Sequence, residues 1–429
     1  MGSIVELTGR ERARARRRRW AEECAREAPV RPKALVRRID HALGEELRRW
    51  SSLPSRAAIE RDEGYRLHRA QVQALLHGFQ WDLRQATATA TARPGRLRAA
   101  AWNVERGKRW QALCGVLQEH PGLQDLDVML LTEVDHGMGR SGNRDVAAML
   151  GQHLGMGHVF VNSHLVLSPG DHAEQDHGVP NTLALHGSAL LTRFPVRRVL
   201  GVGLPEYGDK LHALERRLGA KRAVLVELDA PGGVLTVAVV HLDPFSSPAH
   251  RARQMRRVME SLRELDGRHV LLGGDFNTNT YDLGSLPRLC MSLGRKMLRY
   301  GFAGTIAHYM IPDQQLERPV FDVLAQSGLT TEGFVDRDTD TIRFDLNDPE
   351  YLDKAQRMLP RPLFSWLQRR VEPWNGAVPM RMDWLAGRGV VPRRAWTVTR
   401  PRFRGEHVSD HDPIGVELAW APPAFHDPR

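Results

Sequence analysis

Two short segments rich in polar side chains constrain this chain more than any other feature. They are Gly273-Gly274-Asp275-Phe276-Asn277 and Ser409-Asp410-His411-Asp412-Pro413. The run Val270-Leu271-Leu272 ahead of the first segment is apolar and bounded by glycine, which is typical of a buried strand. Asp275 and Asn277 should therefore project from the carboxyl end of that strand. Carboxylate, amide and imidazole groups at such an edge can hold a divalent metal and direct a water at phosphorus.

Further segments of the same kind occur along the chain in a fixed order. They are Trp102-Asn103-Val104-Glu105, Leu130-Leu131-Thr132-Glu133-Val134, Val239-Val240-His241-Leu242-Asp243 and Arg381-Met382-Asp383-Trp384. In this order the segments resemble the endonuclease/exonuclease/phosphatase superfamily, which includes deoxyribonuclease-I-like nucleases, abasic-site endonucleases, sphingomyelinases and inositol phosphatases. The resemblance covers about residues 97–420 and leaves the first ninety-odd residues uncovered.

The resemblance implies an α/β (α+β layered) fold, a four-layer sandwich of two mixed β-sheets flanked by helices. The sequence agrees with this from Leu97 onward, because short apolar runs alternate there with amphipathic stretches and turn clusters. We expect strands at 97–104, 127–134, 187–192, 221–229, 234–242, 269–275, 382–386 and 414–420.

The resemblance also implies a magnesium or manganese site built from Glu133, Asn103 and Asp410. Magnesium prefers octahedral oxygen coordination with few protein carboxylates, which suits these side chains. Glu133 is the ligand we expect most firmly, since it follows an apolar run where an unused buried carboxylate would be costly.

Five residues are expected to carry the catalysis by resemblance. Asp275 would act as the base or would orient the attacking water, and Asn277 would bind the phosphate or fix that aspartate. His411 would contact the scissile phosphate, and Asp383 would hold its imidazole in one tautomer. His241 would bind a phosphate oxygen or assist the leaving group. Whether His411 donates a proton, accepts one or stabilises charge stays open.

Two further positions have two interpretations each. Glu105 lies two residues after Asn103, so both side chains would share a face if the strand persists, and Glu105 could be a second metal ligand. Abasic-site endonucleases have aspartate at this position. Arg222 matches a basic residue common before the middle strands, and it would either position phosphate or lie at a surface strand end.

The first part of the chain differs in charge from the rest. Residues 1–100 contain 22 Lys and Arg against 12 Asp and Glu, a difference of +10 that equals the net charge of the whole chain. We expect residues 1–92 to form a basic helical N-terminal region and linker, with helices in 10–27, 33–50 and 68–85, ahead of a domain at 97–420. The linker is the alternating Ala and Thr tract at 86–92. This region would attract nucleic acid or anionic lipid, or it would be a solvated helix face.

An insertion of about a hundred residues separates two of the segments. It covers about residues 281–380 and contains basic and aromatic residues such as Arg369, Arg370 and Trp374. It would either select the substrate or form a peripheral helical elaboration with its own core.

Three widely spaced cysteines and an arginine-rich N-terminus without an apolar core favour a cytoplasmic protein without disulfides or a secretion signal. No run approaches the ~18 apolar residues of a membrane span.

These observations predict a metal-dependent phosphodiester hydrolase that uses an activated water, with a nucleic acid as the favoured substrate. A lipid or inositol phosphoesterase would use the same residues. A catalytically inactive binding module would require losses among them, and all eight are present.

Overall fold

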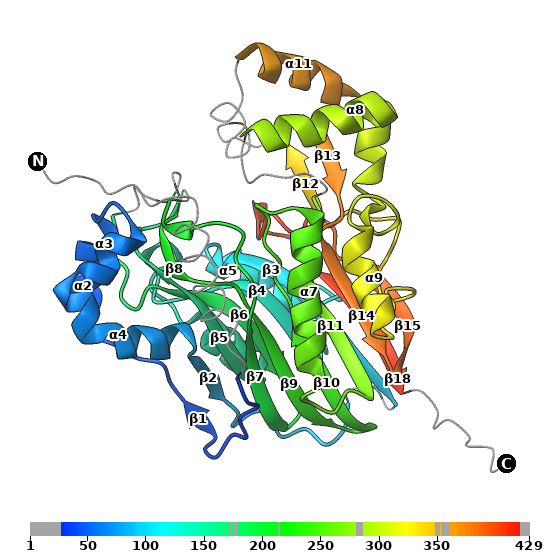
Figure 1. The fold of residues 1–429 in the computed structure, drawn as a ribbon. Helices are drawn as coiled ribbons and strands as arrows, with labels where there is room; N and C mark the ends of the chain where they lie inside the picture. The colour runs from blue at the N-terminus through cyan, green and yellow to red at the C-terminus, as the bar shows by residue number, and fades with distance from the viewer. Residues whose placement is uncertain are drawn as a thin grey trace, which may run out of the picture.

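Two mixed β-sheets form the centre of the protein in the computed structural model (Figure 1). The structure describes residues 27–91, 93, 95–171, 174, 178–212, 215–279, 286–347, 352 and 361–420. The larger sheet has nine strands, ordered β1 (Val36–Arg37), β2 (Phe79–Asp82), β5 (Gly157–Val166), β6 (Leu185–Thr192), β4 (Val128–His136), β3 (Arg96–Arg106), β18 (Ile414–Trp420) and β15 (Val390–Thr397), with β8 (Arg217–Gly219) beside β5.

The second sheet has five strands, ordered β14 (Asp383–Arg388), β11 (His269–Asp275), β10 (Gly233–Val239), β9 (Arg222–Ala230) and β7 (Val196–Gly203). Each sheet contains one parallel pair, β3 with β4 and β10 with β11, and its other pairs are antiparallel. Every strand expected after residue 97 is present, and within the two sheets the sequence prediction missed β5, β7, β8 and β15 in that part of the chain.

Alternate residues of the central strands explain how the layers are held together. In β3, Ala99 and Ala101 belong to the core shared by the two sheets, while Ala100 and Trp102 belong to the core on the outer face. Successive side chains of a strand point to opposite faces, so a strand covered on both sides is apolar throughout. This pattern confirms the four-layer sandwich predicted from the sequence.

Helices cover the outer face of each sheet. Those on the nine-stranded sheet are α2 (Gly44–Ser51), α4 (Glu63–Leu76), α5 (Trp110–Glu119) and α6 (Val146–Leu154), and those on the five-stranded sheet are α7 (Pro248–Leu262) and α9 (Arg318–Gln326). A short helix, α3 (Arg56–Arg61), joins α2 to α4. Local signals fix their ends: Ser247 accepts a hydrogen bond from the His250 backbone N–H at the start of α7, and Pro248 follows it.

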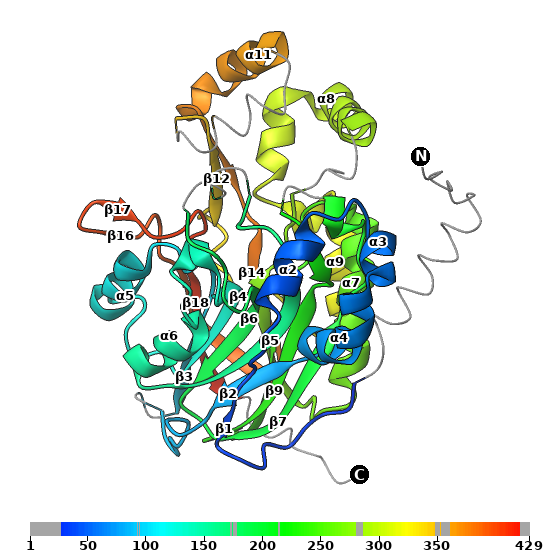
Figure 2. The same ribbon diagram turned by 90° about the vertical axis from the view of Figure 1, so that its left-hand side faces the viewer.

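Residues 27–91 lie on the same layers as the rest of the chain (Figure 2). Strand β2 extends the nine-stranded sheet by pairing with β5, and Trp50 of α2 is fully buried. Residues 33–50 contain β1 and most of α2 instead of one helix, and the helix expected at 68–85 ends at Leu76, where β2 follows. Ala86 of the expected linker is buried, and the Ala88 N–H donates to the Arg193 carbonyl. The helix expected at 10–27 lies almost entirely outside the described residues.

The insertion divides into two parts. Its α9 packs on the five-stranded sheet, whereas α8 (Leu286–His308), β12 (Ile342–Asp345), α11 (Arg361–Val371) and β13 (Ala377–Met380) form a projecting lobe (Figure 1). The lobe has its own small core, which includes Ile306, Phe364 and Met380. A further pair of short strands, β16 (Arg402–Phe403) and β17 (Glu406–His407), forms a hairpin against α5. Among the residues described, no helix is both long and apolar enough to cross a lipid bilayer.

Candidate active site

The residues predicted for the site lie at or next to strand ends. Asn103 and Glu133 belong to the parallel pair β3 and β4, Asp275 ends β11, and Asp383 begins β14 opposite Asp275. The others lie just beyond strands: His241 after β10, Asn277 after β11, and Asp410 and His411 before β18.

Asp275 is the hub of the site. Its carboxylate accepts hydrogen bonds from the Asn277 backbone N–H at 2.8 Å, the Asn277 side-chain amide at 2.9 Å and the Asn103 amide at 3.2 Å. The Nε2 atom of His241 lies 3.5 Å from Oδ2 of the same carboxylate. Burial raises the pKa of Asp275 to about 7, although His411 opposes the rise. Asp275 can therefore exchange a proton near neutral pH.

His411 is oriented from both sides. Its Nδ1 lies 2.7 Å from Oδ2 of Asp383, and its Nε2 faces Asp275 Oδ2 at 3.9 Å. The Trp102 indole donates a hydrogen bond to the His411 carbonyl at 2.9 Å. Burial alone would lower the pKa of His411, but the carboxylates of Asp383 and Asp275 raise it well above the ordinary value. The imidazole is thus held as a cation or as a hydrogen-bond donor.

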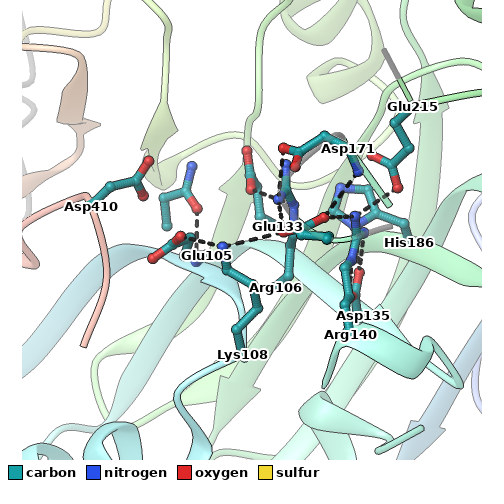
Figure 3. A network of polar contacts seen from close by, with 12 residues as sticks. Glu105, Arg106, Lys108, Glu133, Asp135, Arg140, Asp171, His186, Glu215 and Asp410 are labelled. Atoms are coloured by element: carbon teal, nitrogen blue, oxygen red, sulfur yellow. Dashed lines mark hydrogen bonds and ion pairs between the residues drawn. The ribbon is translucent and has the colours of Figure 1, made fainter. Parts of the chain in front are cut away.

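Glu133 adopts a strained backbone conformation. Its φ is 52°, at a register shift of β4 between Leu131 and Val134. Such conformations in residues other than glycine cost about 1–3 kcal/mol and cluster at functional sites. Arg106 Nε lies 3.6 Å from the Glu133 carboxylate (Figure 3). Burial alone would raise the pKa of Glu133, but Arg106 and His241 hold it well below the ordinary value, so the carboxylate is anionic.

Glu105 does not continue the face of Asn103. Its φ is 44°, and the β3 register shifts at this point, so the strand that would align the two side chains does not persist. Its carboxylate is paired with Lys108 at 2.5 Å and with Arg109. Burial and the charge of Asp410 raise the pKa of Glu105 despite these cations.

The metal-ligand atoms that lie within 4.8 Å of one another in the described part of the chain belong to Asp275, Asp383 and His411. Glu133 and Asp410 are outside this group. Two of these three residues are already hydrogen-bonded to each other, because His411 Nδ1 lies 2.7 Å from Asp383 Oδ2. The Glu133 side chain is 23% exposed. Among the described residues it forms an ion pair with Arg106 and no hydrogen bond.

An oxygen-bound cation fits these donors. Glu133 is an accessible anion, and repulsion between Glu105 and Asp410 would be relieved by a nearby divalent ion.

The basic residue at the start of β9 that faces the site is Lys221, and sequence reasoning missed it. Its ammonium influences the pKa of Glu133, Asp275 and His241. Burial lowers the pKa of Lys221 to about 8, although Asp243, Asp275 and Glu133 oppose the fall.

Arg222, which we expected to touch phosphate or a surface, is buried elsewhere. It donates to the carbonyls of Gly78 and Asn162 at 3.2 Å each and to Glu27 at 2.6 Å. Adjacent strand residues face opposite sides, so only one of the pair can reach the site.

The sequence model of the Endonuclease/Exonuclease/phosphatase family matches residues 100–411. The chain belongs to this family. Members are hydrolases that act on phosphate esters, and the match includes all eight predicted site residues.

The solved structures that match this family member have low sequence identity to it. The protein from Beutenbergia cavernae has 16% identity and a TM-score of 0.45, over 76% of this chain and 72% of its own. A protein of the same family description from Leptotrichia buccalis has 15% identity and a TM-score of 0.41, over 75% of this chain and 98% of its own. The human Nocturnin catalytic domain with bound sulfate has 15% identity and a TM-score of 0.39, over 77% of this chain and 96% of its own. No curated protein sequence matches the chain.

This family member surrounds its strand-end carboxylate with a buried network of charges (Figure 3). Arg106 bridges Glu133 to Asp171 and Glu174, and Arg140 bonds Asp135 at 2.7 Å. The only sign of this network in the sequence was Arg106, directly after Glu105. The acidic partners of Arg106 lie far from it in the chain. The network fixes the charge of Glu133 without burying it completely.

Proposed function

We propose that this protein is a magnesium- or manganese-dependent phosphodiester hydrolase that acts on nucleic acid. The observation that carries the proposal is the position of Asp275, which contacts Asn103 and Asn277 and faces His241 and His411. A carboxylate fixed by two amides and flanked by two imidazoles suits direct attack of water on a phosphodiester.

Glu133, Asn103 and Asp410 would hold the metal in this proposal. When bound, the ion would neutralise charge on the nonbridging phosphate oxygens. The ligands are an anionic carboxylate, an amide oxygen and an exposed carboxylate. Arg106, which pairs with Glu133, would keep that carboxylate deprotonated before the ion arrives.

The protein residues would divide the remaining work. Asp275 would orient the attacking water and accept its proton, since burial raises its pKa to about 7. His411, aligned by Asp383, would donate a hydrogen bond to the phosphate from Nε2. His241 and Lys221 would add donors on the same side, where negative charge develops in the transition state.

A nucleic acid substrate is supported by the charge of the lobe. Helices α8 and α11 contain no acidic residue, and six of their arginines are exposed: Arg288, Arg295, Arg299, Arg361, Arg369 and Arg370. Arginines bind backbone phosphates with release of counterions. The lobe is anchored beside the catalytic histidine by the bridge between Ile342 and His411, so a strand bound there could continue into the site. The arginines at 10–19 lie outside the described residues.

A lipid phosphoesterase is the second candidate, and one observation favours it. Leu298 and Met291 of α8 are 91% and 49% exposed beside Arg295. Exposed apolar residues flanked by arginine are typical of helices that lie on anionic membranes.

The free thiols of Cys114 and Cys290 suit a reducing compartment, and we place the protein in the cytoplasm.

The test is hydrolysis of plasmid DNA, single-stranded DNA, RNA and sphingomyelin vesicles, each with Mg²⁺, Mn²⁺ or EDTA. We expect metal-dependent cleavage of a nucleic acid that is lost in His411→Ala. Cleavage confined to sphingomyelin would select the lipid phosphoesterase. Silence on all four substrates, with a folded protein, would contradict both proposals.

A further inference from the structure

A groove outside the catalytic cluster lies between α5, α6 and the β16–β17 hairpin. It is open to solvent and has a volume of about 560 Å³, which is within the size range of ligand sites. Its walls include Trp110 at the start of α5 and Phe403 from the hairpin. The site described above uses neither of these aromatic residues.

The walls combine aromatic surfaces with amide and imidazole groups that can form hydrogen bonds. Beside Trp110 and Phe403 the groove is lined by Gln111, Gln118, Gln152 and His153. None of the described residues that line it is Asp, Glu, Lys or Arg. Nucleobases present an aromatic face and donor and acceptor edges, which aromatic rings and glutamine amides respectively bind. This lining therefore suits a neutral heteroaromatic ring better than a fatty acyl chain or an ion.

Both walls of the groove are followed or preceded in the chain by residues that contact the candidate site. Trp110 follows Arg109, whose guanidinium is paired with Glu105. The hairpin that carries Phe403 leads into Ser409, whose hydroxyl donates to the Asn103 carbonyl at 2.7 Å. A chain bound in the groove would thus have a continuous protein surface to the metal and phosphate residues.

Two cationic side chains lie over the aromatic rings that line the groove. The Arg144 guanidinium is 5.8 Å from the centre of the Trp110 ring, and that of Arg404 is 5.1 Å from the centre of the Phe403 ring. Glu119 of α5 and Glu406 of the hairpin do not line the groove. Walls without Asp, Glu, Lys or Arg, together with arginines beside the two aromatic rings, match a polymer with uncharged bases and a charged backbone.

We propose that this groove binds a nucleobase of a single-stranded nucleic acid whose scissile phosphate lies in the catalytic site. The identity of the substrate rests on the proposed function, whereas base binding in the groove is measured separately from turnover. Trp110 and Phe403 stack on the base, the glutamine amides meet its edge, and Arg144 and Arg404 face the flanking phosphates.

The test is equilibrium binding of two fluorescein-labelled 12-mers to the full chain in EDTA, followed by anisotropy. One is oligothymidylate, and the other has the same sugar-phosphate backbone with no bases. We expect Trp110→Ala and Phe403→Ala each to weaken binding of oligothymidylate about tenfold, because a lost base stack has an effect of this order. Binding of the base-free strand is expected to change less than twofold.

Trp110→Phe and Phe403→Tyr are the matched controls, because they keep an aromatic face and should bind like the natural chain. If Phe403→Ala fails to fold, Trp110→Ala and Gln118→Ala carry the test. Equal losses for both strands, or no loss for either, would overturn the proposal. Base-dependent binding without cleavage in Mg²⁺ would support base binding in the groove and contradict the nuclease function. Cleavage without base-dependent binding would contradict base binding in the groove alone.

Discussion

Nδ1 of His411 lies 2.7 Å from Oδ2 of Asp383, and Asp383 in turn is the residue opposite Asp275 across strands β14 and β11. Two groups of the candidate site from distant parts of the chain are therefore set by one strand register. The backbone N–H groups of Met382 and Asp383 both donate to Thr341 Oγ1, which ties this register to the base of the projecting lobe.

Asp383→Asn is expected to lower kcat on the order of 10–100-fold with little change in KM, since it removes the carboxylate that aligns and charges His411. Initial rates on bis-p-nitrophenyl phosphate measure this. Asp229→Asn, at an exposed aspartate paired with Arg197, is the matched control. Full activity in Asp383→Asn would show that the imidazole needs no such partner.

Thr341→Val keeps the shape of the side chain but leaves two buried N–H groups without their acceptor. We expect a loss of about 1–3 kcal/mol in the free energy of unfolding. We also expect kcat to fall several-fold, because the Asp383 backbone is no longer fixed. Urea unfolding and initial rates measure the two effects. Thr339→Val is the control, because the Thr339 hydroxyl donates to Asp336 Oδ2 at 2.7 Å and not to the Asp383 backbone, and it should leave kcat unchanged.

Trp50→Ala is expected to destabilise the whole protein by about 3–5 kcal/mol, as large truncations in a core do. Trp50 is fully buried, and its indole donates to Asp62 at 3.0 Å. Leu67→Ala, in the neighbouring helix and 78% exposed, is the control and should change stability by less than about 0.5 kcal/mol. Urea unfolding measures the free energy of unfolding of both variants. If Trp50→Ala were as stable as the natural chain, residues 27–91 would be an appendage.

Glu174→Gln tests the charge network behind Glu133. Burial alone would raise the pKa of Glu174, but Arg106 and Arg140 lower it from 4.5 to about 2. The folded-state pKa is depressed, so this carboxylate contributes stability above pH 4.5 and loses it as the pH falls towards 2. The variant should be less stable by about 3 kcal/mol at pH 7, at about 1.4 kcal/mol for each pKa unit. Denaturant unfolding at pH 7 and pH 4 should show a smaller difference at pH 4, and a difference that grows on acidification would contradict the network.

The sequence was sufficient to predict that Asp275 ends a strand, because it follows the apolar run Val270-Leu271-Leu272. The closeness of Asn103 and His411 to Asp275 was expected from the order of the family segments, since no apolar run precedes His411. The choice between Lys221 and Arg222 could not be made, since it depends on which face of β9 each residue occupies. The pairing of Glu133 with Arg106 depends on left-handed conformations at both residues, for which their residue types give no signal.

The integration of residues 27–91 was also hidden in the sequence. Strand β2 has only four residues, Phe79–Asp82, and directly follows an amphipathic helix, so its apolar residues continue the helical spacing. Only its pairing with β5 reveals the strand. In the insertion, likewise, α9 and α8 have similar compositions, and their separation into sheet cover and lobe depends on tertiary contacts.

The most direct measurement is hydrolysis of bis-p-nitrophenyl phosphate during a Mg²⁺ titration, with Glu133→Gln beside Glu260→Gln. Glu260 is a half-exposed residue of α7 and serves as the control. We predict saturable activation by Mg²⁺, abolition by EDTA, and a loss of at least about tenfold in metal affinity or rate for Glu133→Gln alone. Hydrolysis that persists in EDTA, or a Glu133→Gln variant that responds to Mg²⁺ like the natural chain, would contradict a metal-dependent phosphodiester hydrolase built on Glu133.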